Sequence, residues 1–224
     1  MKNKTLIALV TLFTISSAAK ANIDLEGVYL SASVANVSYE ISDAERRSIQ
    51  EDFNGVGDSS FFDSDSGYQL KIGYRVNDFF SAEIGYLNLG NFGFGVDVDV
   101  DLVVDNSMYN VAGNIDSIYE VDGYVAGLLG HYPLTDNLTG FARVGLYNWE
   151  ATGDVVTALT STFQAQTSQS RESESLEGLG SSDHYFGFGF TYNFDLIELV
   201  AEYETFTLED QDVSSFGIGT VYRF

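Results

Sequence analysis

Apolar and polar side chains alternate one by one in several segments of this chain, and this alternation limits its fold more than any other feature. In the segment 67–76, Tyr68 and Leu70 fall on one face of a strand, while Gln69 and Lys71 fall on the other. A period of two residues is typical of β-strands with two different faces, and long helical periods are absent. The chain is therefore expected to be all-β.

The same pattern predicts eight strands. They are expected at residues 28–35, 67–76, 80–86, 118–132, 138–149, 184–194, 197–204 and 216–224. Both faces of the segment 118–132 have similar side chains, so its register stays open at this stage. The strands of about ten residues match the ~9–11 residues that a tilted strand needs to cross a bilayer.

The connections between these strands alternate in length. Those at 77–78, 133–137 and 195–196 are short, that at 207–212 is moderate, and those at 41–65, 91–116 and 152–181 are long. Short turns at one end and long loops at the other are typical of outer-membrane barrels. A secreted β-sandwich would also alternate. Aromatic strand ends and charges of both signs on the opposite faces favour an eight-stranded antiparallel up-and-down transmembrane β-barrel.

The N-terminus has the pattern of a cleavable secretory signal. Lys2 and Lys4 precede an apolar stretch, and Ala19 and Ala21 stand at the −3 and −1 positions of a cleavage site. The sequence thus predicts a signal peptide at 1–21 and a barrel domain at 22–224. Cleavage would remove three of the ten basic residues and none of the 33 acidic ones, so the net charge would change from −23 to 7 minus 33, or −26.

Two segments resemble the outer-membrane protein A-like family of eight-stranded barrels. One is Tyr132-Pro-Leu-Thr-Asp-Asn-Leu138 with Phe141-Ala-Arg-Val-Gly145 and Trp149; the other is the ending Phe216-Gly-Ile-Gly-Thr-Val-Tyr-Arg-Phe224. The resemblance implies a bacterial outer-membrane location in a Gram-negative cell envelope, with lipid and lipopolysaccharide as surroundings. It also implies that the barrel-assembly machinery recognises the alternate residues of the last strand, which are Phe216, Ile218, Thr220, Tyr222 and Phe224.

The resemblance is incomplete in the barrel interior and beyond the barrel. Glu83 and Arg143 match interior positions of the family's charged gate, but Leu129, Val200 and Thr191 stand where its other members would be. The chain stops at the last barrel residue, so the peptidoglycan-binding domain of the best-known member is not implied.

Charged residues on the inward faces predict an ion-pair network that fills the lumen. Its expected members are Lys71, Arg75, Arg143 and Arg223 with Glu83, Glu198, Glu202 and Glu204. Four charges of each sign balance, and buried charge persists only when it is paired. The interior of an eight-stranded barrel is just wide enough for side chains. A narrow ion-conducting pore is the alternative.

The expected outer loops contain most of the surplus acid. The segments 41–65, 91–116, 152–181 and 207–212 hold 19 acidic residues against Arg46, Arg47 and Arg171, a net charge of −16. Such a surface excludes nucleic acid as a partner and favours a solvated exterior. It could also share divalent cations with lipopolysaccharide phosphates. The Ser-, Thr- and Gln-rich stretch 157–182 is expected to be mobile.

Specific sites are few. Asp97, Asp99 and Asp101 would share one face of a strand above the membrane; they could hold Ca²⁺ loosely, but the calcium-loop pattern is missing. Ser182 lies two residues before His184, a spacing that only faintly suggests a lipid-modifying enzyme. No cysteine, catalytic set or cofactor motif is present, so no cofactor is expected. The sequence favours a monomeric, largely occluded barrel with a structural or surface-interaction role, and the alternative is an adhesin-like or receptor-like module whose surface ligand is unknown.

Overall fold

The computed structural model describes residues 25–54, 56–104, 107–163, 166–194, 197–209 and 211–224, which form nine strands and one helix. The elements are β1 (Val28–Tyr39), α2 (Asp43–Asp52), β2 (Gly57–Phe62), β3 (Ser64–Arg75), β4 (Phe80–Val104), β5 (Ser107–Pro133), β6 (Leu138–Phe163), β7 (Gln166–Phe194), β8 (Ile197–Leu208) and β9 (Gln211–Arg223). The expected signal peptide, with Ala19 and Ala21, and the turn at 195–196 lie outside the described residues.

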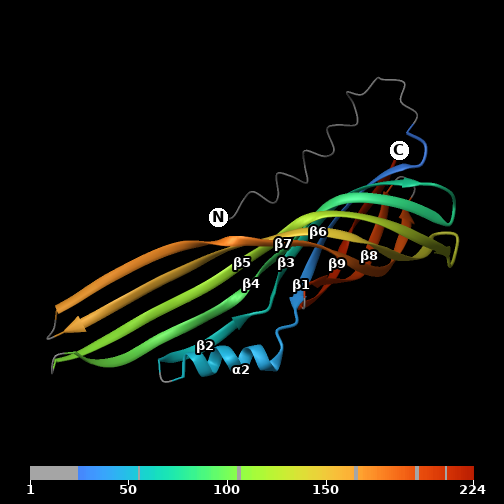
Figure 1. Cartoon of the computed structure of the whole chain (residues 1–224). Coiled ribbons are helices and arrows are strands. Elements are labelled where there is room, and N and C mark those ends of the chain that lie inside the picture. Colours follow the sequence, from blue (N-terminus) through green and yellow to red (C-terminus); the bar gives the residue numbers. More distant parts are fainter. Residues whose placement is uncertain (1–24, 55, 105–106, 164–165, 195–196, 210) are drawn as a thin grey trace.

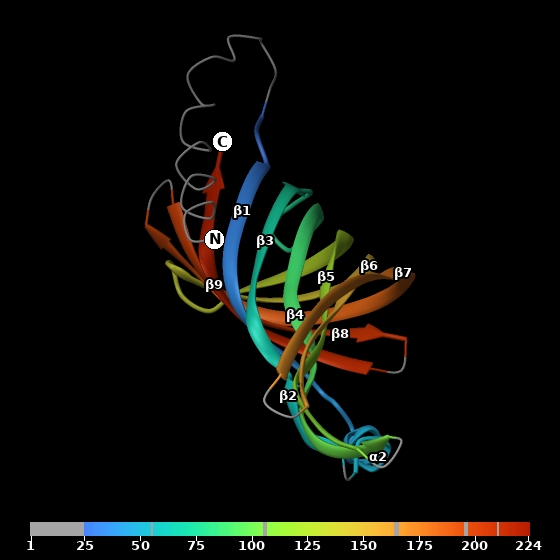
Figure 2. The same ribbon diagram turned by 90° about the vertical axis from the view of Figure 1, so that its left-hand side faces the viewer.

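Eight of these strands form a closed antiparallel ring. The order is β1-β3-β4-β5-β6-β7-β8-β9, and β9 pairs with β1 to complete it. Figure 2 shows the strands curving round a common axis. Closure pairs the strands along the whole ring and leaves no sheet edge there. The predicted eight-stranded up-and-down barrel is therefore confirmed, and β2 is an additional strand that pairs with β4 outside the ring.

Side chains in the ring point alternately outward and into the lumen. On β4, Ile84 is 62% exposed, whereas its neighbour Glu83 is 4% exposed. On β5, Tyr124 points outward, while Val121 and Val125 are buried, which fixes the register that the sequence left open. The turns at 76–79 and 134–137 lie at the same end of the barrel as the start of β1 and the end of β9. We call this the short-turn end.

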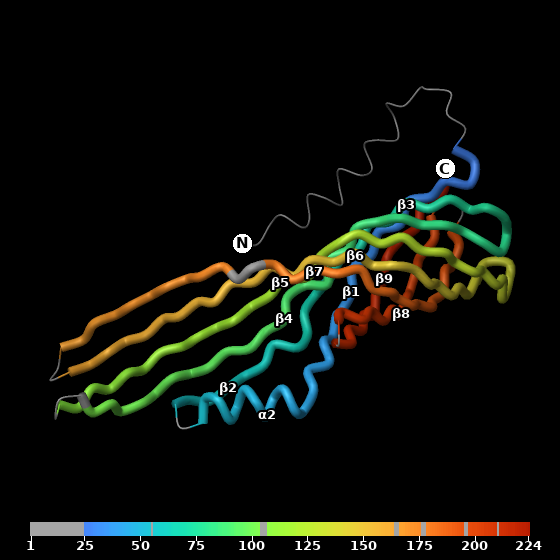
Figure 3. Tube along the Cα trace, in the orientation of Figure 1, coloured from blue at the N-terminus to red at the C-terminus, as the bar shows by residue number. Residues whose placement is uncertain are grey.

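Four neighbouring strands continue far beyond the ring at the opposite end. β4, β5, β6 and β7 have 25, 27, 26 and 29 residues, and they stay paired along their length. At about 3.3 Å per residue, 25 residues span about 80 Å. Figures 1 and 3 show this projecting sheet, here called the extension.

The extension overturns the expectation of long loops at 91–116 and 152–181. In the stretch 157–182, expected to be mobile, residues 157–163 lie in β6 and residues 166–182 lie in β7, with Leu159 paired to Ser170 and Ser161 to Ser168. The stretch was expected to be mobile because it has no regular spacing of apolar residues. A strand needs only partners for its backbone N–H and C=O groups, and Ser, Thr and Gln side chains do not prevent that pairing.

A β-bulge between Asn88 and Asn91 marks the base of the extension on β4. Gly90 in the bulge has φ +74°, a left-handed conformation that glycine adopts without steric cost. The extra residue exchanges the two faces of the strand. Odd-numbered residues such as Glu83 point inward below the bulge, whereas Asp97 and Asp99 above it are exposed and the intervening Val98 is buried.

The long connection 41–65 also contains regular structure, namely α2 and β2. Ser42 and Glu45 form a reciprocal capping box at the start of the helix. Arg46 pairs with Asp63 at 2.6 Å and stacks on the ring of Phe61, which fastens the helix to β2. No helix within the described ranges is long and apolar enough to cross a membrane.

Candidate functional site

The barrel lumen is filled by three successive layers of side chains. A large apolar cluster lies toward the extension, an ion-pair cluster lies in the middle, and a small apolar cluster lies at the short-turn end. The alternation of the strands produces this stacking, because each inward residue occupies the height set by its pairing register.

The middle layer, called the central cluster, consists of Lys71, Glu83, Arg143, Glu202 and Glu204. Lys71 Nζ lies 2.9 Å from Glu204 Oε1. Arg143 contacts all three carboxylates: Glu83 Oε2 is 3.0 Å from Nε, Glu202 Oε2 is 2.8 Å from Nη1, and Glu204 also meets Nη1. All five side chains are at most 5% exposed. The guanidinium fork of arginine suits such a bridging position.

Neutral donors complete the central cluster. It holds two cations and three carboxylates, and each carboxylate also accepts a hydrogen bond from an uncharged side chain. Tyr29 donates to Glu83 at 2.7 Å, Ser33 to Glu202 at 2.8 Å, and Gln69 to Glu204 at 2.5 Å. These donors add one hydrogen bond to each carboxylate, which stabilises the surplus negative charge without a third cation inside the cluster.

The other charges expected in the lumen lie apart from the central cluster. Arg223 pairs with Glu198 at 2.6 Å near the short-turn end, where Arg223 is partly exposed. Arg75 forms no ion pair with any described residue, and its Nη2 is 3.4 Å from the backbone carbonyl of Asp78. Five of the eight predicted residues thus form the central cluster, Arg223 and Glu198 form a separate pair, and Arg75 belongs to neither.

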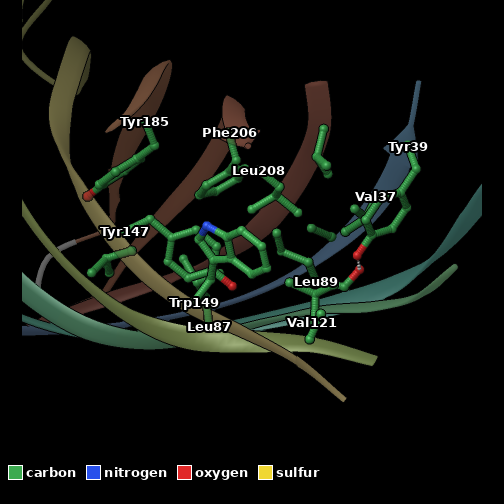
Figure 4. Packing of buried hydrophobic residues seen from close by; sticks show 14 residues of the cluster. Val37, Tyr39, Leu87, Leu89, Val121, Tyr147, Trp149, Tyr185, Phe206 and Leu208 are labelled. Carbon is green, nitrogen blue, oxygen red and sulfur yellow. Dashed lines mark hydrogen bonds between the residues drawn. The ribbon is translucent and has the colours of Figure 1, made fainter. Parts of the chain in front are cut away.

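Aromatic rings close the lumen on the side of the extension (Figure 4). Phe206 stacks on Tyr185 with centroids 5.5 Å apart and meets Tyr147 edge-on at 5.3 Å; all three are at most 1% exposed. Tyr39 donates to the Leu89 carbonyl at 3.0 Å. The full cluster is Ala35, Val37, Tyr39, Leu87, Leu89, Val121, Val125, Tyr147, Trp149, Ala151, Tyr185, Phe206, Leu208 and Val213.

The small apolar cluster occupies the positions where the resembled family has its gate charges. Leu129 and Val200 pack there with Tyr29, Phe141 and Val221. Thr191 lines the adjacent cavity, which has a volume of only about 30 Å³. Apolar side chains at these positions cannot form a charged gate, and a cavity of this size holds no more than a few waters.

The lumen also contains a serine–histidine pair that the sequence reading missed. Ser81 Oγ lies 2.7 Å from His131 Nε2 across the β4–β5 pairing. Ser81 is only 1% exposed, so a substrate has no access to its hydroxyl. On the outer surface Ser182 accepts a hydrogen bond from Asn148 and His184 stacks edge-on against Phe186. Neither arrangement supplies an accessible nucleophile with its base.

The remaining residues that sequence reasoning missed are the aromatic rings and the neutral donors. Their signal was present in the alternation, which puts Tyr185 opposite the outward phenylalanines and Tyr29 and Ser33 opposite the outward residues of β1. Counting only charged residues on the inward faces overlooked it.

The acidic residues of β4 lie on one face of the extension, as the alternation implied. Asp97, Asp99 and Asp101 are exposed, and Asn110 on β5 donates to Asp99 and Asp101 at 3.1 and 3.2 Å. Two of the three carboxylates therefore share one amide donor from the neighbouring strand. Within the described residues, no group of three or more acidic, histidine or cysteine side chains is arranged to hold a metal ion.

Comparisons with known proteins agree with this architecture. Residues 5–224 match the family described as outer membrane protein beta-barrel domain. No curated protein matches the chain.

Several solved structures are also similar to the chain. Ail, the attachment invasion locus protein of Yersinia pestis, is 17% identical over 89% of this chain and 99% of that chain, with a TM-score of 0.45. OprG from Pseudomonas aeruginosa is 14% identical over 89% and 96%, with a TM-score of 0.48. Neisserial surface protein A is 13% identical over 89% and 98%, with a TM-score of 0.41.

Proposed function

Because the chain belongs to the outer membrane protein beta-barrel domain family, we propose that it is an occluded outer-membrane anchor that presents an elongated sheet at the cell surface for interaction. The barrel is integral to the bacterial outer membrane, and lipid surrounds its exposed apolar face. The extension is the part that acts. We propose that the extension binds a surface partner and that this binding attaches the cell.

The observation that carries this proposal is the unequal length of the strands. β8 has 12 residues, close to what a bilayer crossing requires, whereas β7 has 29. The extra residues form a paired sheet of regular geometry, which holds its surface at a fixed height and orientation. A protein that only spans the membrane needs no such structure.

The filled lumen supports an anchoring role over a conducting one. Large rings, the five charged residues of the central cluster and a small apolar cluster follow one another along the axis. An ion would have to displace a hydrogen-bonded buried charge, which costs several kcal/mol. Steady conductance of the refolded protein in a planar bilayer would contradict this part of the proposal.

Export and assembly complete the proposal. We expect cleavage after Ala21 and recognition of the last strand by the barrel-assembly machinery. The alternate residues Phe216, Ile218 and Phe224 are each more than half exposed on the outward face of the barrel end, where such a machinery can read them. Lipopolysaccharide would surround the base of the extension, and the barrel would act as a monomer.

The experiment is removal of the extension at paired residues. Gly93 pairs with Ile118, and Val155 with Glu174, so deletion of 94–117 and 156–173 leaves each hairpin ready for a short Asn-Gly turn. Cells with the trimmed protein should lose attachment to surfaces or to other cells. Detergent sensitivity should not change, and heat-modifiable gel migration should show an intact barrel.

The opposite result would contradict the proposal. Unchanged attachment with increased detergent sensitivity would assign the protein a structural role in the envelope.

A further inference from the structure

A cavity of about 30 Å³ lies in the lumen between the central cluster and the short-turn end. Arg75, Arg143 and Arg223 line it, and the carboxylates in its lining are those of Glu83 and Glu198. With the single lining histidine neutral, three positive and two negative charges give the lining a formal charge of +1.

Both carboxylates of the lining are already paired with the other two arginines. Glu83 contacts Arg143 at 3.0 Å, and Glu198 pairs with Arg223 at 2.6 Å. Among the described residues no carboxylate oxygen lies within 4.0 Å of the Arg75 guanidinium. Its Nε is buried and has no hydrogen-bond partner in that part of the chain. Within the described residues, Arg75 is therefore the one arginine of the lining that forms no ion pair of its own, and Glu198 and Asp78 attract it only from a greater distance.

The surplus carboxylate of the central cluster does not compensate Arg75. Glu202 and Glu204 are held by Lys71, by Arg143 and by the neutral donors described above. The lumen is balanced in total, but its positive surplus lies at the cavity and its negative surplus lies in the centre. Arg75 is partly exposed, but its Nε is buried and unpaired among the described residues, so an anion placed beside that atom would interact with it more strongly than the distant carboxylates do.

We propose that the cavity binds one halide ion, chloride under physiological conditions, beside Arg75. A single negative charge makes the lining neutral, and the free Nε–H supplies a directional donor. A water needs about 10–15 Å³ of such volume, so a cavity of about 30 Å³ accepts a monatomic anion of similar size. Orthophosphate would require the lining to move.

The test is the thermal stability of the refolded full-length protein in detergent micelles, measured by the gel shift of the heat-denatured form. Sodium chloride is compared with sodium gluconate and with sodium phosphate at equal ionic strength. The wild-type midpoint should rise saturably with chloride and stay unchanged with gluconate, while any rise with phosphate should be gradual, unsaturated and equal in Arg75→Gln. Arg75→Gln should lose the chloride-dependent part of the midpoint. The matched control Arg171→Gln, at an exposed site in the extension, should keep it.

A second measurement covers the case in which Arg75→Gln does not refold. Bromide-soaked crystals of the wild type should show an anomalous peak within hydrogen-bond distance of Arg75 Nε. The proposal is overturned if chloride and gluconate give the same midpoint, if phosphate stabilises and chloride does not, if Arg75→Gln responds like the wild type, or if bromide does not occupy the cavity. None of these outcomes bears on the extension, so the proposed surface role is tested separately.

Discussion

Arg143 has the largest number of charged partners in the described structure, because it contacts three carboxylates at once. Arg143→Gln should leave these carboxylates with Lys71 as the nearest cation in the cluster. Breaking a buried pair in this way costs about 3–5 kcal/mol. Guanidinium unfolding of the refolded protein should show this loss.

The control for Arg143 is the second substitution Glu204→Gln. It removes one of the carboxylates that Arg143→Gln leaves without an arginine partner, so the double variant should recover part of the lost stability. A double variant no more stable than Arg143→Gln alone would show that the ion pairs do not couple. Arg171→Gln, which is exposed, should change the free energy of unfolding by less than about 0.5 kcal/mol.

At Gly90 the backbone conformation determines the residue type. Its φ of +74° is strained for any residue with a Cβ, and a Cβ there would lie 2.9 Å from Asp65 Cβ. Gly90→Ala should therefore destabilise the protein by about 1–2 kcal/mol in the same unfolding experiment. A Cβ at Gly130 meets nothing within 4 Å, so Gly130→Ala should be close to neutral. Equal losses in both variants would contradict the role of the bulge.

At the scale of the element, α2 depends on its N-terminal cap. Ser42 Oγ accepts a hydrogen bond from Glu45 N, and Ser42 N donates to Glu45 Oε2 at 2.9 Å. Ser42→Ala should cost the helix about 1 kcal/mol and increase amide hydrogen exchange in residues 43–52. Ser48→Ala, at an exposed position inside the same helix, should slow that exchange slightly, since alanine is the better helix former. Exchange unchanged by Ser42→Ala would mean that packing alone holds α2.

The start of β3 is tied to the β4 bulge by an ionised carboxylate. Partial burial opposes the ionisation of Asp65, but hydrogen bonds from Ser66 N, Asn91 N and Asn91 Nδ2 outweigh it and hold the pKa below its usual range. A lowered folded-state pKa adds stability above the unfolded value of about 3.9, and this stability is lost as the pH falls through the folded value.

Carbon-detected NMR titration should place the Asp65 pKa below 3.9. Asp65→Asn should remove the acid-dependent change in the Asn91 amide resonance. A titration at or above 3.9 would contradict the strength assigned to the three bonds.

Sequence reasoning predicted the ring elements well and the extension poorly, for separate physical reasons. In the ring, lipid and a filled lumen impose opposite demands on alternate residues, so Phe188 and Gly187 carry a clear signal. In the extension, water contacts much of the sheet, and residues such as Ser168 and Gln169 stay in the strand through backbone pairing alone. The bulge at Gly90 adds a change of face that strict alternation does not anticipate. The capping box of α2 was a readable signal, and a search for Ser-x-x-Glu would have found it.

For the molecule as a whole, the layered lumen predicts that no single layer controls conductance. Glu83→Ala should stay non-conducting in a planar bilayer, because the rings of Tyr147, Tyr185 and Phe206 still close the lumen. The variant with Tyr147 and Phe206 replaced by alanine should also stay non-conducting. In it Arg143 on β6 still pairs with Glu83 on β4 and with Glu202 on β8.

Only a variant that weakens all three layers should conduct. Tyr147→Ala and Phe206→Ala remove two rings from the first layer, Glu83→Ala removes one carboxylate from the second, and Phe141→Ala removes one ring from the third. We expect steady conductance from this quadruple variant and none from its parents, measured on protein with unchanged heat-modifiable migration so that misfolding is not mistaken for opening. Conductance of the Glu83→Ala protein as large as that of the quadruple variant would mean that the aromatic rings do not block ions. The barrel would then have a single gate at the central cluster, and its role as a sealed support for the extension would have to be given up.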